Sequence, residues 1–229
     1  MSSDFRHRVR SSIEGPVAGF FGRLGLTPNA LTLIGFGIAI IGAYLAATQI
    51  WLLAGVVVAF GAIFDLFDGA LARATNKTSK LGAFLDSVFD RAGEVVVYLG
   101  VAIGLMAVEH YVGAVLSAGA MAAAMMVSYT RAKSESLGFS SGSGMASVGL
   151  APREVRTVML VGGLIGAGAL GGFQQVQCVT APCPPVVGTG GFVLLGSLAL
   201  IAIAATLTTL QRIYFVYQQS KHQPTTDPK

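Results

Sequence analysis

The sequence predicts an all-α integral membrane protein with six transmembrane helices, and three observations support this prediction. First, 53% of the 229 residues are hydrophobic and only 11% are charged, whereas a soluble domain is about a quarter charged. Second, three long runs carry no charged residue: 24–64, 111–130 and 157–211. Third, the 15 Lys and Arg residues fall in a few segments that can all lie on the same side of the membrane. This composition excludes a disordered chain, a fibrous repeat and an ordinary soluble enzyme.

The N-terminal segment, residues 1–25, is predicted to form an amphipathic helix in the membrane interface. Apolar Phe5, Val9, Ile13 and Val17 recur every four residues, while the arginines of this segment lie elsewhere. Such a helix buries its apolar face in lipid and keeps its arginines near the headgroups. The alternative is a frayed basic tail.

Six stretches are long and apolar enough to cross the bilayer, which requires roughly 20 residues. They are placed at 29–48, 51–74, 81–107, 112–137, 154–173 and 190–217. If both termini face the cytoplasm, every Lys and Arg then lies on the cytoplasmic side, as the positive-inside rule requires. We therefore expect one six-helix domain over residues 26–217, followed by a disordered polar tail over 218–229.

The two cysteines, Cys178 and Cys183, fall in the connection before the last predicted span, which would face outside. Two thiols do not complete a zinc site. They either form a small disulfide in an oxidising compartment or remain separate thiols, and the sequence leaves both alternatives open.

Four carboxylates lie in two successive spans, where charges are costly and usually mark function. Asp65 and Asp68 are three residues apart near the end of the second span, and Asp86 and Asp90 are four apart near the start of the third. These spacings place each pair on one helix face. Because the connection between the spans is short, the four carboxylates can converge near the cytoplasmic surface.

Such a cluster of carboxylates requires countercharge, and Mg²⁺ or Mn²⁺ is the natural choice for oxygen ligands. A site with two divalent cations suits displacement at phosphorus. Small residues surround the acids and would allow a bulky ligand to approach: Gly69, Ala70, Ala72, Gly82 and Ala83. In the alternative, the acids only form pairs with Arg73, Arg91 and Lys80, but pairing alone does not require this spacing.

These residues resemble the signature of the CDP-alcohol phosphotransferase (CDP-alcohol phosphatidyltransferase) family, D-x-x-D-G-x-x-A-R-x8-G-x3-D-x3-D. All eight fixed positions are present: Asp65, Asp68, Gly69, Ala72, Arg73, Gly82, Asp86 and Asp90. The segment from Thr27 to Thr32 also resembles a motif that precedes the first span in this family.

The resemblance implies a homodimer of six-helix subunits that transfers a phosphatidyl or similar group from a CDP-lipid donor, such as CDP-diacylglycerol, to an alcohol and releases CMP. It implies that Asp65, Asp68 and Asp86 hold two divalent cations, and that Asp90 binds one of them and is the general base. The CDP site would comprise Gly69, Ala72, Arg73, Gly82, Asn29 and Thr32. The site would face the cytoplasm of a bacterial or archaeal cell membrane, and nucleic acid is not an expected partner.

Five further cations are more than one donor pyrophosphate needs, which suggests a second anionic ligand such as a phosphorylated acceptor. They are Arg131, Lys133, Arg153, Arg156 and Arg212. Each could instead anchor the protein at the lipid headgroups.

The pattern of these cations is similar to that of phosphatidylinositol-phosphate synthases, whose acceptor is inositol 1-phosphate. It departs from their pattern in Arg131-Ala132-Lys133, where they often carry Lys-Ala-Arg, and around Arg153. Glycerol 3-phosphate is the alternative acceptor, which would give phosphatidylglycerol phosphate, and basic residues alone do not separate the two.

Two functions of other classes were weighed against the enzyme. A cation-coupled transporter predicts acids near the middle of the bilayer and broken helices in both halves of the chain. The acids fall at one membrane face instead, and no inverted repeat is visible in the sequence. A structural scaffold leaves the acid cluster unexplained.

Overall fold

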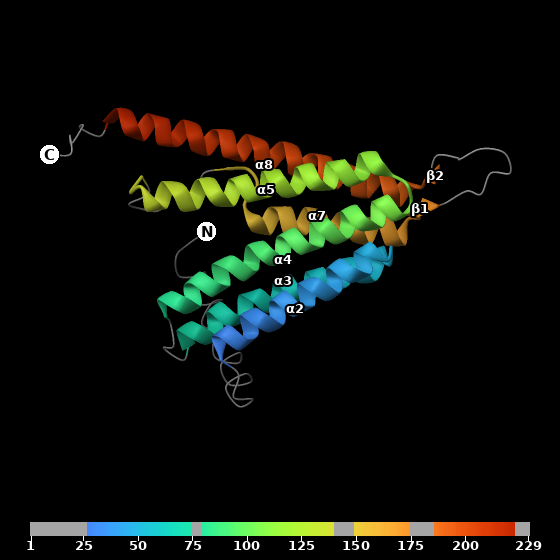
Figure 1. The fold of residues 1–229 in the computed structure, drawn as a ribbon, viewed down its shortest axis with the longest axis horizontal. Coiled ribbons are helices and arrows are strands. Elements are labelled where there is room, and N and C mark those ends of the chain that lie inside the picture. Colours follow the sequence, from blue (N-terminus) through green and yellow to red (C-terminus); the bar gives the residue numbers. More distant parts are fainter. Residues whose placement is uncertain (1–26, 75–78, 140–148, 175–185, 223–229) are drawn as a thin grey trace, which may run out of the picture.

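A computed structural model describes residues 27–74, 79–139, 149–174 and 186–222. Within these residues the chain forms six helices and one short two-stranded ribbon (Figure 1). The helices are α2 (Pro28–Ala47), α3 (Trp51–Ala74), α4 (Lys80–Ala107), α5 (Tyr111–Ser136), α7 (Arg153–Ala169) and α8 (Thr189–His222). Each lies within a few residues of a predicted span, so an all-helical fold with helices at the six predicted places is confirmed for this part of the chain. The predicted N-terminal helix, residues 1–25, lies outside the described residues.

Local sequence explains where several helices begin and turn. The Thr27 hydroxyl accepts a hydrogen bond from Ala30 N at the start of α2, and Ser79 accepts one from Gly82 N at the start of α4. The tight α2–α3 and α4–α5 connections turn at Gln49 and Glu109, where φ is 64° and 59°. Consecutive helices are therefore antiparallel, and both connections lie at the same end of the bundle (Figure 1).

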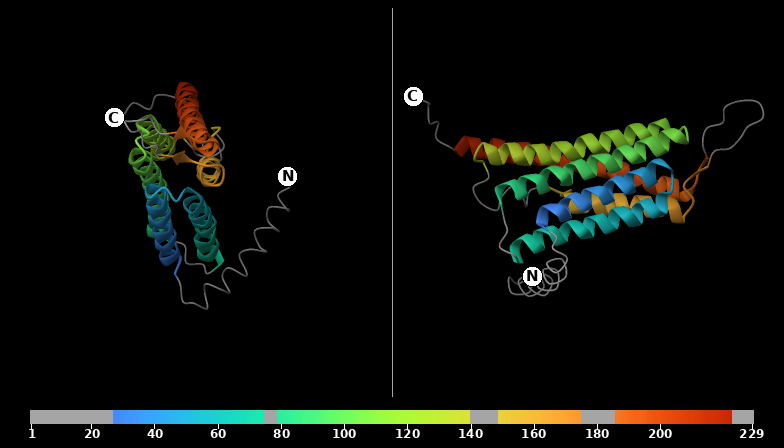
Figure 2. Two further views of the ribbon diagram at one scale, coloured as in Figure 1. Left: turned by 90° about the vertical axis from the view of Figure 1, so that its right-hand side faces the viewer. Right: turned by 60° about the horizontal axis from the view of Figure 1, so that its bottom comes forward.

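The six helices form a ring when viewed along the bundle (Figure 2). Each helix packs on two neighbours, in the order α2, α3, α7, α8, α5, α4 and back to α2. The α2–α4 contact is especially close, because a Cβ on Gly100 or Gly104 would overlap the backbone of Ala43 or Ala46. In this ring, α4 and α7 lie opposite each other.

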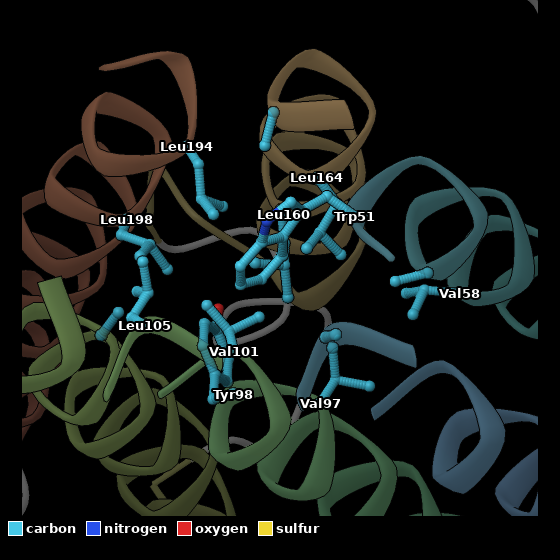
Figure 3. Packing of buried hydrophobic residues seen from close by; sticks show 14 of the residues in the cluster. Trp51, Val58, Val97, Tyr98, Val101, Leu105, Leu160, Leu164, Leu194 and Leu198 are labelled. Carbon is cyan, nitrogen blue, oxygen red and sulfur yellow. The ribbon is translucent and has the colours of Figure 1, made fainter. Parts of the chain in front are cut away.

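Apolar side chains from α3, α4, α7 and α8 fill the inside of the ring (Figure 3). Trp51, Tyr98, Leu164 and Leu198 are at most 5% exposed. Between helices that face lipid, such side chains stabilise the fold through close van der Waals packing. Many large apolar residues are nevertheless exposed on the outside of the helices, as expected for a bundle that faces lipid.

Three helices have the length and apolar composition needed to cross a membrane: Pro28–Ala47, Tyr111–Ser136 and Thr189–Lys221. Within the described residues, α3 contributes a shorter apolar stretch, Trp51–Asp65. The other two helices fall outside this group for identifiable reasons. Helix α4 carries four charged residues between positions 86 and 94, and α7 has 17 residues.

Two boundaries differ from the prediction. Helix α7 ends at Ala169, before a left-handed Gly171 with φ of 75°. Strands β1 (Phe173–Gln174) and β2 (Val186–Val187) then pair antiparallel. The predicted cysteine pair, Cys178 and Cys183, lies outside the described residues.

The polar tail predicted from residue 218 begins later, because α8 continues to His222. Two contacts between residues one turn apart support its last turns. Gln218 Nε2 donates to the Tyr214 hydroxyl at 2.6 Å, and the Lys221 ammonium lies 4.5 Å from the centre of the Tyr217 ring.

Candidate active site

The predicted acids lie where the end of α3 meets the start of α4. Asp65 on α3 and Asp90 on α4 have side chains that are 23% and 17% exposed. Asp86 lies one turn before Asp90, and its charged neighbours include Asp65 and Arg153. Three carboxylates from two helices therefore converge, as their spacing predicts.

The fourth predicted acid, Asp68, is on α3 one turn beyond Asp65, but its side chain lies outside the described residues. The same holds for the side chains of the predicted CDP-site residues Ala72 and Arg73, and for Gly69. All four positions belong to helix α3.

A guanidinium group lies between the two best-defined acids. Arg153, the first residue of α7, places Nη2 2.7 Å from Asp65 Oδ2 and Nη1 2.7 Å from Asp90 Oδ2. The predicted acceptor ligand thus contacts two of the predicted metal ligands. The guanidinium of Arg91 is 3.8 Å from Asp90 and hydrogen-bonds Ser87 instead.

In the part of the chain that the structure describes, no group of three or more His, Cys, Asp or Glu residues is arranged to hold a metal ion. The side chain of Asp68, the fourth predicted ligand, lies outside that part, and Arg153 contacts one oxygen each of Asp65 and Asp90. The chemistry of the donor set still fits hard divalent cations, which prefer carboxylate oxygens. With Arg153 displaced, Asp65 and Asp90 would present free oxygens beside Asp86.

Gly35 on α2 was not predicted from the sequence, yet it makes room for Asp65. A Cβ built on Gly35 would lie 2.6 Å from Asp65 Oδ1. Any larger residue would therefore push this carboxylate away from its present position. A glycine in an apolar helix carries no signal of this role in the sequence.

Of the predicted CDP-site residues with described side chains, two lie side by side. A Cβ on Gly82 of α4 would lie 3.2 Å from Asn29 Oδ1 of α2. Thr32, one turn further along α2, is 9% exposed and donates a hydrogen bond to the Pro28 carbonyl. The starts of α2 and α4 thus bring Asn29, Thr32 and Gly82 to the end of the bundle that holds the acids.

Three of the five predicted acceptor-phosphate ligands are neighbours, since Arg131 and Arg156 both lie near Arg212. Arg156 is 1% exposed and pairs with Glu94 of α4. Arg212 is 4% exposed and donates to the Val127 carbonyl, which joins α8 to α5.

The remaining two predicted ligands lie on the exposed end of α5. Arg131 pairs with Glu135 at 2.8 Å and is a charged neighbour of Arg212. Lys133 is exposed. Arg153 is the predicted acceptor ligand that contacts Asp65 and Asp90 among the described side chains.

A small cleft with a cavity volume of about 50 Å³ lies beside the acids. Asp65, Asp90, Glu94 and Arg153 line its polar part. Apolar residues of four helices line the rest: Phe36 and Ala39 of α2, Val58 of α3, Val97 of α4 and Leu160 of α7. The cleft is therefore charged at the acids and apolar further inside the bundle.

Comparison with known proteins agrees with this arrangement. Residues 25–180 match the family described as CDP-alcohol phosphatidyltransferase. The chain is 39% identical to the archaetidylinositol phosphate synthase of Pyrococcus horikoshii over 70% of this chain and 80% of that protein. It is 31% identical to the phosphatidylinositol phosphate synthase of Streptomyces avermitilis over 90% of this chain and 78% of that protein.

The fold is similar to that of a solved structure, the phosphatidylinositol phosphate synthase of Mycobacterium tuberculosis with CDP-DAG bound. The TM-score is 0.74 at 24% identity, over 95% of this chain and 98% of that one. The likeness shows that the six-helix ring is an arrangement known from this class of membrane protein. Together with the match of the family over residues 25–180, it leads to one conclusion: the chain belongs to the CDP-alcohol phosphatidyltransferase family.

Proposed function

We propose that this protein transfers a phosphatidyl group from CDP-diacylglycerol, or a similar CDP-lipid, to inositol 1-phosphate, giving phosphatidylinositol phosphate and CMP. The observation that carries the proposal is the meeting of acids from α3 and α4 with a cation from α7, at the polar end of an apolar cleft. Relatives named for inositol phosphate acceptors support the choice of acceptor.

Two divalent cations, Mg²⁺ or Mn²⁺, are part of this proposal. Asp65, Asp86 and Asp90 would hold them together with Asp68, whose position on α3 is one turn from Asp65. When bound, such ions stabilise the negative charge that develops on a transferring phosphate and its leaving oxygen.

Residues of the chain itself would accept the proton that is released and would orient the reactants. Asp90 accepts the proton of the acceptor hydroxyl, whose oxygen forms a bond to the lipid-bearing phosphorus of the donor. The bond from that phosphorus to the CMP oxygen breaks, and CMP leaves with the electron pair. Asn29, Thr32 and Gly82, with Gly69, Ala72 and Arg73, would orient the cytidine end.

The acceptor phosphate would be bound chiefly by Arg153, because this cation already reaches the acids. Arg131, Lys133 and Arg212 would add positive charge from α5 and α8. Arg156, which is buried against Glu94, would support this site from within the bundle.

We also propose the membrane arrangement. All six helices would cross the bilayer as one domain over 26–217, with both termini and the acids on the cytoplasmic side, as the distribution of Lys and Arg favours. Residues 1–25 would lie in the interface, and two copies would form a homodimer.

The test is transfer by the purified protein in vesicles that contain CDP-diacylglycerol. Labelled inositol 1-phosphate and labelled glycerol 3-phosphate are supplied in parallel, each with Mg²⁺ or with EDTA. Lipid-bound label from inositol 1-phosphate that EDTA abolishes supports the proposal. If only glycerol 3-phosphate gives lipid-bound label, glycerol 3-phosphate is the acceptor and inositol 1-phosphate is not. Transfer that survives EDTA would refute the proposed metal dependence.

A further inference from the structure

A second ion pair lies directly beneath the acids. Glu94 is four residues after Asp90 on α4, and Arg156 is three residues after Arg153 on α7. Arg156 Nε and Nη2 donate to the two carboxylate oxygens of Glu94, both at 2.8 Å. The two side chains are 1% and 6% exposed, so the pair lies inside the bundle.

The pair connects two helices that face each other across the ring. Helix α4 packs on α2 and α5, and α7 packs on α3 and α8. The Asp90–Arg153 and Glu94–Arg156 pairs therefore form two parallel links across the interior. Of these links, the Glu94–Arg156 pair is the buried one, with a planar two-bond geometry that fixes the orientation of the guanidinium.

The same guanidinium also holds the segment that leads into α7. Arg156 Nη1 donates to the Ala151 carbonyl at 2.9 Å. The Leu150 and Ala151 amides donate to Thr208 Oγ1 of α8, both at 3.0 Å. Arg153 follows two residues after Ala151, so its backbone is held between α8 on one side and Glu94 on the other.

Stability alone does not account for such a pair. Two charges removed from water lose much of their solvation, and an apolar pair of similar volume is often as stable or more stable. Because the pair lies one turn below Asp90 and Arg153, it can instead affect the position of Arg153. Any shift of Arg156 moves the first turn of α7, which carries Arg153.

We propose that Glu94 is a positioning residue for the transfer reaction. Acting through Arg156 and Ala151, it holds the first turn of α7 so that Arg153 stays beside Asp65 and Asp90, within reach of an acceptor phosphate when metal ions take the carboxylate oxygens. This inference rests on the proposed function, in which those residues serve the metal ions and the acceptor phosphate. It assigns to α4 a fifth functional acid that the family signature does not contain.

The test replaces both charges together, so that neither is left buried without its partner. The double variant Glu94→Leu with Arg156→Met should keep an unfolding temperature close to that of the wild type. Its KM for inositol 1-phosphate should nevertheless rise about 10- to 100-fold, the usual effect of losing a residue that orients a ligand. The KM for CDP-diacylglycerol should change much less.

A second readout does not depend on the reaction. Phenylglyoxal labels accessible arginines, and peptide mass spectrometry follows the labelling of Arg153 alone. In the double variant Arg153 should react faster, because it is no longer held against the acids. If the double variant does not fold, Arg156→Lys keeps the charge, loses the two-bond geometry, and should give the same two changes.

Ser117→Ala is the matched control, since Ser117 is buried and donates to the Tyr98 carbonyl of α4 at 2.9 Å, away from the acids. It should affect stability without altering KM or Arg153 labelling. Wild-type kinetics and labelling in the double variant would overturn the inference. Failure of the wild type to use inositol 1-phosphate would overturn the proposed function, while the labelling experiment would still test the positioning.

Discussion

Replacing Arg153 with alanine is predicted to tighten the binding of divalent cations while weakening the binding of the phosphorylated acceptor. Arg153 donates to Asp65 and Asp90, each at 2.7 Å. Any cation that uses the same oxygens must first displace this guanidinium. The substitution removes the competitor but also removes the proposed ligand of the acceptor phosphate, so the two affinities should change in opposite directions.

The size of the effect follows from the geometry. A buried hydrogen bond to a charged group contributes about 1.5–3 kcal/mol. The three side chains are 17–32% exposed, so solvent screening reduces this contribution, and we take about 1.5 kcal/mol for both bonds together. That free energy corresponds to about tenfold tighter binding. Titration of Mn²⁺ followed by electron paramagnetic resonance measures it directly in the purified protein.

Arg91→Gln is the matched control, because it removes the same charge from the neighbourhood of Asp90. Its guanidinium is 3.8 Å from Asp90, so the gain in Mn²⁺ affinity should be clearly smaller. Mn²⁺ binding in Arg153→Ala that is equal to or weaker than in the wild type would refute the reasoning. If Mn²⁺ affinity rises equally in the two variants, the effect comes from the change in net charge and not from freeing the ligand oxygens.

Three further predictions concern the acids and the helix contacts around them. Asp90→Asn should lower the transfer rate about 10²- to 10⁴-fold through loss of the general base, with the protein still folded by circular dichroism; undiminished CMP release would contradict the assignment. Gly35→Ala should weaken both Mn²⁺ binding and transfer, because its Cβ would lie 2.6 Å from Asp65 Oδ1. An unchanged Mn²⁺ affinity would show that the Asp65 carboxylate can shift without losing its role, which contradicts the prediction. Gly100→Leu should lower the unfolding temperature strongly, since its side chain would overlap the backbone of Ala43; an unchanged melting curve would disprove the close α2–α4 contact.

The helices and the acids were predictable because their signals are local in the sequence. Long apolar runs mark the helices, and the spacings of three and four between acids place each pair on one helix face. The short connection after α3 brings the two pairs together. Each of these steps depends on residues that are near each other along the chain.

Partners across the ring could not be predicted in the same way. Glu94 is an acid inside a predicted span, one turn after Asp90, but the sequence does not reveal that Arg156 reaches it from the opposite helix. The same limit applies to Gly35, which accommodates Asp65 from α2. The sequence predicts Arg156 as an acceptor ligand without indicating that it is buried, because its burial depends on how α7 packs in the ring.

The acids and Arg153 are proposed to serve transfer from a CDP-lipid to a phosphorylated inositol. Mass spectrometry of the lipid product, with CMP measured in the same reaction, tests it most directly. We expect phosphatidylinositol phosphate and CMP in equal amounts, both dependent on inositol 1-phosphate and on a divalent cation. CMP released without acceptor, or a lipid product that lacks the inositol phosphate group, would contradict it.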